Sequence, residues 1–154
     1  MEITLAVKPD QNVRQLLEEL DDELGALYSP EQRHSLNLEA VFKPHIRFFL
    51  ARRDNEVVGC GGVAVFDDFA EVKRMYVRPQ ARGQGVADAV MAKLVGVTRD
   101  EGLSVLRLET GISSFPALAF YRRAGFRDCP AFAPYASLPP EQVACSAFLE
   151  MRLA

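Results

Sequence analysis

Apolar residues recur at helical spacing in several segments of the chain, and each such stripe predicts an amphipathic helix. The first segment spans residues 10–27, and its apolar positions are Val13, Leu16, Leu17, Leu20, Leu24 and Leu27. The second follows Gly85, and its apolar positions are Val86, Val90, Leu94 and Val97. Gly102 is the expected end of this second helix, because glycine readily adopts the left-handed conformation that closes a helix.

Two further segments carry the start and stop signals of helices. Ser114 is placed to cap a helix over residues 115–124, with Pro116 in its first turn and Gly125 directly after it. The stretch "SPEQ", residues 29–32, combines a capping serine with a proline and a glutamate. It predicts a short helix soon after the first one.

Other apolar segments have the length and the flanking turns of β-strands. The expected strands are residues 3–7 and the segments "IRFFLARRD", "EVVGCGGVAVF", "EVKRMYV", "LSVLRLET" and "ACSAFLEMRL". Asp54 and Asn55 separate the second strand from the third, and they predict a two-residue hairpin turn although the usual glycine is missing. A proline-rich loop is expected over residues 130–140.

The order of these elements predicts one domain over residues 1–154, with no internal repeat and no linker. Strands joined by tight turns should pair antiparallel. The strand–helix–strand unit from Val72 to Leu108 should be a right-handed parallel crossover. The fold class is therefore α/β, with a mixed and mostly antiparallel sheet and helices on both faces.

Composition excludes several classes of protein. Hydrophobic residues make up 49% and charged residues 25% of the 154 positions, so disorder is not expected. The net charge of −3 gives no basic surface for nucleic acid. Cys60, Cys129 and Cys145 form neither a CxxC pair nor a cluster with histidine, which argues against a disulfide framework and against a metal site. No signal sequence and no membrane-spanning run is found, so a cytoplasmic location is expected.

The stretch "MYVRPQARGQGVADAV" places two glycines between a predicted strand and a predicted helix. Amides in the first turn of a helix lack intrahelical partners, and the helix dipole adds positive potential there. Gly83 and Gly85 would let a pyrophosphate approach those amides, and Arg78 and Arg82 could add charge. A tight turn that only needs positive φ explains the glycines equally well. The Gly-Lys-Ser/Thr ending of a Walker loop and the third glycine of a Rossmann fingerprint are both missing.

Residues 77–87, "VRPQARGQGVA", resemble the acyl-CoA-binding signature of the GNAT acetyltransferases, Gln/Arg-x-x-Gly-x-Gly/Ala, with Gln80, Gly83 and Gly85 at its fixed positions. The segments "DNEVVGCGG", "LRLETG" and "ALAFYRRAGF" are similar to the family's central hairpin, fifth strand and fourth helix. "FAPYASLP" is similar to a loop in a bacterial branch of the family. The resemblance covers roughly residues 52–153 in the right order.

The resemblance implies the GNAT fold, acetyl-CoA as co-substrate and no metal. The pyrophosphate is then expected on the turn formed by Gln80, Arg82, Gly83, Gln84, Gly85, Val86 and Ala87. The pantetheine arm is expected to pair like an added strand with the backbone of Met75, Tyr76 and Val77. An amide near Met75 or Tyr76 would polarise the thioester carbonyl. Ser114 stands where relatives often carry Asn or Gln, so the pantetheine contact there would fall to a shorter hydroxyl.

Three residues are candidates for catalysis. Tyr121 stands at the position of the family's usual general acid, and would protonate the departing thiolate or hold its sulfur by a hydrogen bond. Glu71 is the first candidate base, because some members of the family carry a base glutamate four residues before the first pantetheine-contacting residue, as Glu71 stands to Met75. Strand alternation predicts Glu71, Lys73 and Met75 on one face, where a water chain could connect them. Glu109 is the alternative base. For each residue a structural role competes: a core tyrosine, or a solvated or ion-paired carboxylate.

The predicted activity is transfer of acetyl from acetyl-CoA to a primary amine of a small molecule or protein, by direct attack in a ternary complex. A non-catalytic acyl-CoA sensor and, less favoured, a nucleotide-binding switch are the alternatives. The acceptor pocket is expected between the first two helices, the hairpin 52–66 and the loop 130–140. Phe132 and Tyr135 would either line it or serve as ordinary packing. The sequence leaves the acceptor and the oligomeric state open, a homodimer included. Arg33, Arg47 and Arg52 could attract an anionic acceptor, although scattered arginines are usually solvated. His34 and His45 are expected to be structural or surface residues.

Overall fold

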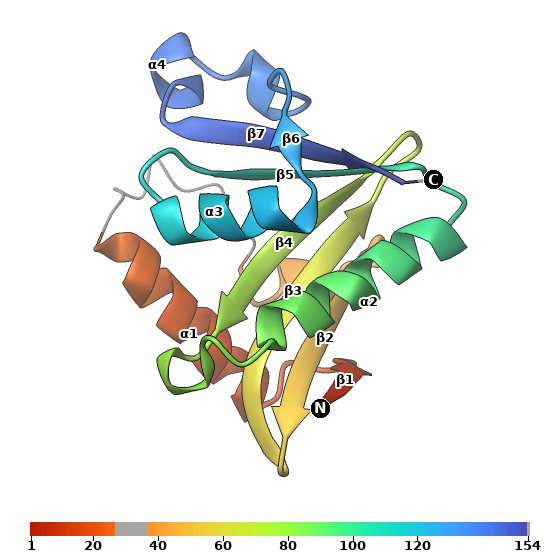
Figure 1. Ribbon diagram of the computed structural model, residues 1–154, viewed down its shortest axis with the longest axis vertical. Helices are drawn as coiled ribbons and strands as arrows, with labels where there is room; N and C mark the ends of the chain where they lie inside the picture. The colour runs from red at the N-terminus through yellow and green to blue at the C-terminus, as the bar shows by residue number, and fades with distance from the viewer. Residues whose placement is uncertain (27–36, 154) are drawn as a thin grey trace.

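The computed structural model describes residues 1–26 and 37–153, and these form a seven-stranded mixed sheet with helices on both faces (Figure 1). The predicted helix at residues 29–32 lies outside the described residues, as do Arg33 and His34. The strands are β1 (Glu2–Leu5), β2 (Ile46–Arg53), β3 (Glu56–Val65), β4 (Ala70–Val77), β5 (Val105–Gly111), β6 (Arg127–Asp128) and β7 (Ser146–Arg152). The helices are α1 (Gln11–Gly25), α2 (Val86–Asp100), α3 (Phe115–Ala124) and α4 (Pro140–Val143), with 3-10 turns η2 (Ala40–Phe42), η3 (Pro79–Ala81) and η4 (Tyr135–Ser137).

The sheet has the strand order β1-β2-β3-β4-β5-β7-β6, and only the β4–β5 pair is parallel. The other neighbouring strands pair antiparallel. Helices α2 and α3 pack in the hydrophobic cluster on one face, whereas α1 packs in the cluster on the other face. The predicted mixed sheet, its parallel β4–α2–β5 crossover and its helices on both faces are confirmed.

Contacts between neighbouring residues account for the start of α1 and for the turn of the β2–β3 hairpin. The Asp10 side chain caps α1 by accepting a hydrogen bond from the Val13 amide at 3.1 Å. The helix stripe is buried at Val13, Leu16, Leu17 and Leu20. Asp54 and Asn55 both have positive φ, 52° and 67°, which a two-residue hairpin turn requires. The predicted turn is confirmed although neither residue is glycine.

A bulge in β4 changes which face its residues occupy. Cys60 of β3 pairs with Tyr76, and Gly62 pairs with Lys73, so the single residue Gly61 lies opposite both Arg74 and Met75. Arg74 has φ +54°. A Cβ on Gly61 would lie 2.7 Å from the Met75 sulfur, so glycine allows this close approach.

The bulge overturns one expectation from strand alternation. Val72 and Met75, three residues apart, both pack with the α2 cluster. Glu71 therefore faces away from that cluster, and Met75 faces toward it. The prediction that Glu71 and Met75 share one face is wrong, because the inserted residue at Arg74 shifts the alternation by one position.

The C-terminal third contains elements that the sequence did not reveal. The predicted last strand is β7, which lies between β5 and a two-residue strand, β6, that was not predicted. Helix α4 forms within the segment expected to be a proline-rich loop. Ser114 stands at the N-cap position of α3, with Pro116 in the first turn and Gly125 at the C-cap, as predicted. The Ser114 side chain makes no capping hydrogen bond, so that part of the prediction is wrong.

Candidate active site

Strands β4 and β5 pair at one end only. Their ladder consists of Ala70 with Leu106 and Glu71 with Arg107. Beyond this point the two strands diverge toward their carboxyl ends (Figure 1). The backbone from Met75 to Val77 lies on the part of β4 past the divergence, with β3 as its paired neighbour. An extended ligand can therefore add to this edge as a strand would.

The glycine turn at the end of β4 is open. Gly83 and Gly85 have φ of +74° and +83°, and a Cβ at either position would meet no heavy atom within 4 Å. Gly85 is the N-cap of α2, and the amide of Ala89 bonds back to its carbonyl at 3.1 Å. Amides ahead of Ala89 belong to the first turn, where helices offer unpaired donors and positive potential. The turn has the space and the donors that an anion needs.

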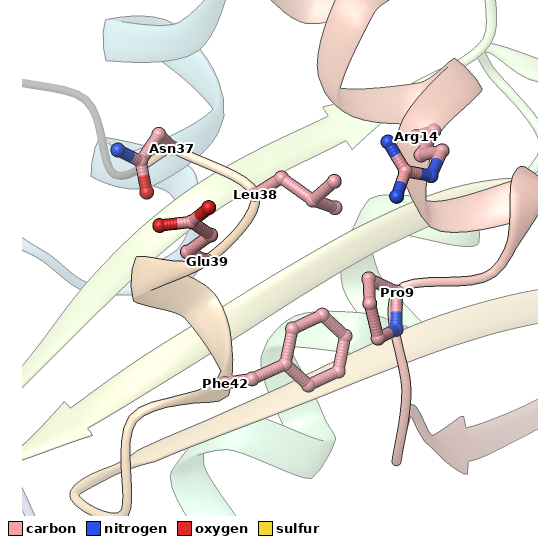
Figure 2. Close-up of a pocket in the computed structure, with 6 residues that line it drawn as sticks. All are labelled: Pro9, Arg14, Asn37, Leu38, Glu39 and Phe42. Carbon is pink, nitrogen blue, oxygen red and sulfur yellow. The ribbon is translucent and has the colours of Figure 1, made fainter.

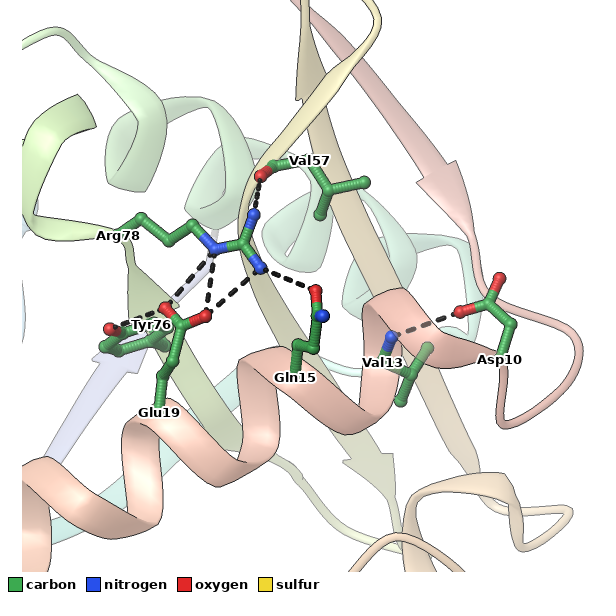
Figure 3. A network of polar contacts seen from close by, with 7 residues as sticks. All are labelled: Asp10, Val13, Gln15, Glu19, Val57, Tyr76 and Arg78. Carbon is green, nitrogen blue, oxygen red and sulfur yellow. Dashed lines mark hydrogen bonds and ion pairs between the residues drawn. The ribbon is translucent and has the colours of Figure 1, made fainter.

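Arg78, which the sequence offered as added charge for the turn, forms an ion pair with Glu19 of helix α1 (Figure 3). Its Nε donates to both carboxylate oxygens of Glu19 at 3.3 and 3.2 Å, and its Nη1 donates to the Val57 carbonyl at 2.7 Å. The Tyr76 hydroxyl also donates to Glu19, at 3.2 Å. The charge of Arg78 is therefore compensated, and this arginine ties α1 to the end of β4.

Side-chain contacts with α1 and with Arg53 of β2 hold the shape of the turn. Arg82 pairs with Glu23 of α1 at 2.7 Å, and its Nε donates to the Val77 carbonyl at 2.9 Å. Arg53 donates to both the side chain and the carbonyl of Gln84, the latter at 3.0 Å. The Gln84 amide in turn donates to the carbonyl of Gln80 at 3.3 Å. These contacts fix the turn before any ligand arrives. Of the remaining predicted residues, the Val86 side chain is buried in the core and Ala87 is half-buried.

Tyr121 lies on α3 with its ring in the core. The ring contacts Phe120 and Phe126 at centroid distances of 5.4 and 5.7 Å. Within the described residues no group hydrogen-bonds the Tyr121 hydroxyl. Burial, and secondarily the negative charge of Glu109, raises the pKa of Tyr121 above its ordinary value. The phenol therefore stays protonated at neutral pH. Ser114, at the start of the same helix, is buried.

Glu71 belongs to a buried triangle of polar groups. One oxygen, Oε2, accepts from the Tyr135 hydroxyl at 2.6 Å and pairs with Lys73 at 2.9 Å. Lys73 also donates to the Tyr135 oxygen at 2.7 Å. Glu71 is 1% exposed, and its other oxygen, Oε1, has no partner in the part of the chain that the structure describes. Burial, then the charge of Glu71, raises the pKa of Tyr135.

Glu109, the alternative base, lies in a different setting. Its Oε2 accepts from the Ser146 hydroxyl at 2.6 Å. Its charge contributes to the raised pKa of both Tyr121 and Tyr135. The sequence predicts Tyr135 as pocket lining or as ordinary packing, and the structure adds its contact with Glu71. Tyr135 also packs with Phe132, at 5.4 Å between ring centroids, in a small aromatic cluster.

A separate surface pocket of about 470 Å³ lies between the start of α1 and η2 (Figure 2). Its lining residues are Pro9, Arg14, Asn37, Leu38, Glu39 and Phe42. None of the candidate site residues belongs to it. Over residues 1–26 and 37–153, no group of three potential metal ligands occurs and no helix is long and apolar enough to cross a membrane.

Comparison with known proteins identifies the family. The acetyltransferase (GNAT) family model matches residues 13–126. An IAA acetyltransferase of Azospirillum brasilense is 45% identical over 129 residues, which is 82% of this chain and 84% of that protein. A solved structure of a candidate acyl-CoA N-acyltransferase from Klebsiella pneumoniae has a TM-score of 0.80 at 31% identity, covering 99% of this chain and 97% of that one.

A more distant solved structure carries a ligand. This GNAT acetyltransferase from Elizabethkingia anophelis, with acetyl-CoA bound, has a TM-score of 0.68 at 20% identity and covers 99% of this chain and 97% of that chain. At that identity the likeness concerns the fold alone. Together with the family match and the 45% identical relative, the fold leads to one conclusion: the chain belongs to the GNAT family of acetyltransferases.

Proposed function

We propose that this protein transfers acetyl from acetyl-CoA to a primary amine of a small molecule or protein, by direct attack in a ternary complex. The divergence of β4 and β5 directly after Glu71 is the observation that carries the proposal. It opens an edge of β4 that ends at the glycine turn, so one extended ligand can bind both. The fold shared with an acetyl-CoA-bound acetyltransferase supports the same reading.

In this proposal the donor is bound mainly by backbone. The amides of residues 82–87 bind the pyrophosphate, and the backbone of Met75, Tyr76 and Val77 pairs with the pantetheine arm. A backbone amide at Met75 or Tyr76 donates to the thioester carbonyl oxygen, where negative charge develops during attack. The Ser114 hydroxyl contacts the pantetheine. The open space at Gly83 and Gly85 fits this arrangement.

Glu71 is the proposed proton acceptor. An amine is mostly protonated at neutral pH and must lose a proton before it attacks. The unpartnered Oε1 of Glu71 can accept that proton, while Oε2 is held by Lys73 and Tyr135. The amine nitrogen forms a bond to the acetyl carbon and loses a second proton to solvent, the carbon–sulfur bond breaks, and coenzyme A leaves as a thiolate that takes a proton from solvent.

Tyr121 is better suited to hold the departing sulfur than to protonate it fully. Its pKa lies above the ordinary value of about 10, whereas an alkyl thiol has a pKa of about 8.5. Complete proton transfer from the phenol to the thiolate is therefore unfavourable. A hydrogen bond from the free hydroxyl still stabilises the charge that develops on sulfur.

Amine-dependent release of free coenzyme A tests the proposal. The protein is incubated with acetyl-CoA and a panel of primary amines, thiol is measured with a colorimetric reagent, and the acetylated product is identified by mass. We expect release that depends on both the amine and the protein. Tight binding of acetyl-CoA without release for any amine would favour a non-catalytic acyl-CoA sensor instead. The candidate base at Glu71 and the free hydroxyl of Tyr121 support the catalytic reading, because a sensor requires neither.

A further inference from the structure

Two side chains on β4 are buried with unused hydrogen-bonding capacity. The Oε1 of Glu71 has no partner among the described residues, and neither do the Nε and Nη1 of Arg74. The Glu71 and Arg74 side chains are only 2% and 3% exposed. Buried polar atoms in native proteins are nearly always paired, and exceptions often mark places where a ligand or water supplies the partner.

The bulge brings these two side chains to the same face of the sheet. In a regular strand, residues 71 and 74 would point to opposite faces. Here Glu71 faces away from the α2 cluster, and Arg74 reaches α1 on that same side, where it donates to the Leu17 carbonyl at 3.3 Å and to Asp21 at 2.7 Å. Their α-carbons are at most about 10 Å apart along the strand. A ligand that carries two polar groups would have to enter between these side chains to contact both of them.

The unused atoms have opposite character. Each side chain already has a counter-ion, Lys73 for Glu71 and Asp21 for Arg74. The two ion pairs therefore do not require a ligand with a net positive or a net negative charge. It still requires a donor group for Glu71 and an acceptor group for Arg74. The ammonium of an amine acceptor is such a donor. A carboxylate is such an acceptor group, and its hydrogen bonds with a guanidinium are strong.

The negative charge of α1 bears on which anionic group of a ligand can contact Arg74. The helix carries Glu18, Glu19, Asp21, Asp22 and Glu23 in its second half, close to where Arg74 contacts Leu17 and Asp21. Arginines pair with Glu19, Asp21 and Glu23, so five carboxylates face three arginines and an excess of negative charge remains. This excess repels a doubly charged phosphate more strongly than a singly charged carboxylate. The observations therefore favour a carboxylate.

Resting on the proposed function, we infer that the acceptor is a small zwitterion, an amino acid in the broad sense, whose amine contacts Glu71 and whose carboxylate contacts Arg74. Acetylation converts its ammonium to an amide, coenzyme A leaves as the thiol, and one proton is released. Arg74 is then a specificity-determining residue that is not needed for the chemistry itself.

Matched acceptors test this inference on the wild-type protein. Initial rates of coenzyme A release are compared for γ-aminobutyrate against propylamine and for L-phenylalanine against phenethylamine, each pair differing only by the carboxylate. We expect kcat/KM to favour the amino acid of at least one pair by about 10-fold or more, the usual worth of a hydrogen bond to a charged group. Equal or better rates with the plain amines overturn the inference while leaving the proposed function intact. No release from any acceptor, with acetyl-CoA bound, overturns both.

Variants assign the preference to one residue. In Arg74→Gln the ratio of amino acid to amine should fall toward one. In Arg152→Gln, which removes an arginine from the exposed end of β7, the ratio should stay at the wild-type value. Coenzyme A affinity measured by calorimetry reports whether each variant is folded. A ratio that persists in folded Arg74→Gln overturns the assignment, and the uncharged variant Arg74→Met, if Gln does not fold, is read in the same way.

Discussion

The glycine turn allows a test in which backbone strain and ligand contact can be separated. Gly83 precedes α2 and Gly102 follows it, with nearly equal φ of +74° and +77°. A Cβ at either position would meet nothing within 4 Å, so neither substitution creates a clash. The two sites lie at opposite ends of α2, about 22 Å apart by helix rise. Gly102 is therefore a matched control for Gly83.

The expected effect of Gly83→Glu follows from charge. Both Gly83→Glu and Gly102→Glu cost about 1–2 kcal/mol of stability, because a side chain is forced to positive φ. At Gly83 the new carboxylate also lies beside the proposed pyrophosphate. At ~5 Å and an effective dielectric constant of ~40, each of two phosphate charges costs ~1.7 kcal/mol, or about 3 kcal/mol together. The affinity for coenzyme A should fall by roughly 100-fold.

Calorimetry with coenzyme A, together with thermal melting, distinguishes the outcomes. Both variants should melt a few degrees below the wild type. Only Gly83→Glu should lose affinity. Wild-type affinity in folded Gly83→Glu, or an equal loss in Gly102→Glu, would refute the idea that this turn binds the pyrophosphate.

Further predictions concern the chemistry and the core. Tyr121→Phe should lower kcat about 100-fold and leave coenzyme A affinity near the wild-type value; an unchanged kcat would exclude Tyr121 from the mechanism. Glu71→Gln should lower kcat/KM about 100-fold, and Glu109→Gln less than 10-fold; the reverse order in rate assays would assign the base to Glu109. Burial raises the pKa of Cys60 from 9.0 to about 12. The Cys60 thiol ionises at a lower pH in the unfolded chain than in the folded protein. Its contribution to the free energy of unfolding, about 4 kcal/mol, is therefore present below pH 9 and is lost as the pH rises toward 12. Urea unfolding from pH 8 to 11 should therefore depend less steeply on pH in Cys60→Ala than in the wild type, and equal slopes would contradict this.

Much of the fold could be predicted because its signals are local. The Asp54–Asn55 turn, the glycine turn and the apolar stripe of α1 each depend on neighbouring residues. The bulge at Arg74 is indicated less clearly by the sequence than these turns are. Lys73 and Arg74, two charged residues in succession, interrupt the alternation of β4, and this could have been read as an inserted residue.

The partners of the candidate residues could not be predicted in the same way. Tyr135 bonds to Glu71 across 64 positions of sequence, and Arg53 bonds to Gln84 across 31. Such contacts are set by how the elements pack, and no local spacing encodes them. For the same reason the sequence did not reveal that Arg78 and Arg82 are paired with acids of α1.

The two arginines at the turn differ in how easily they can change partners. The side chain of Arg78 is 18% exposed and also bonds to the Val57 carbonyl, whereas that of Arg82 is 46% exposed in a pair with Glu23 that is itself 44% exposed. Exposed ion pairs are worth at most about 1 kcal/mol. An arriving diphosphate can therefore recruit Arg82 at small cost while Arg78 stays fixed. Binding of the donor would then break the ion pair between Arg82 and Glu23 of α1. We therefore expect added coenzyme A to increase hydrogen exchange in that helix.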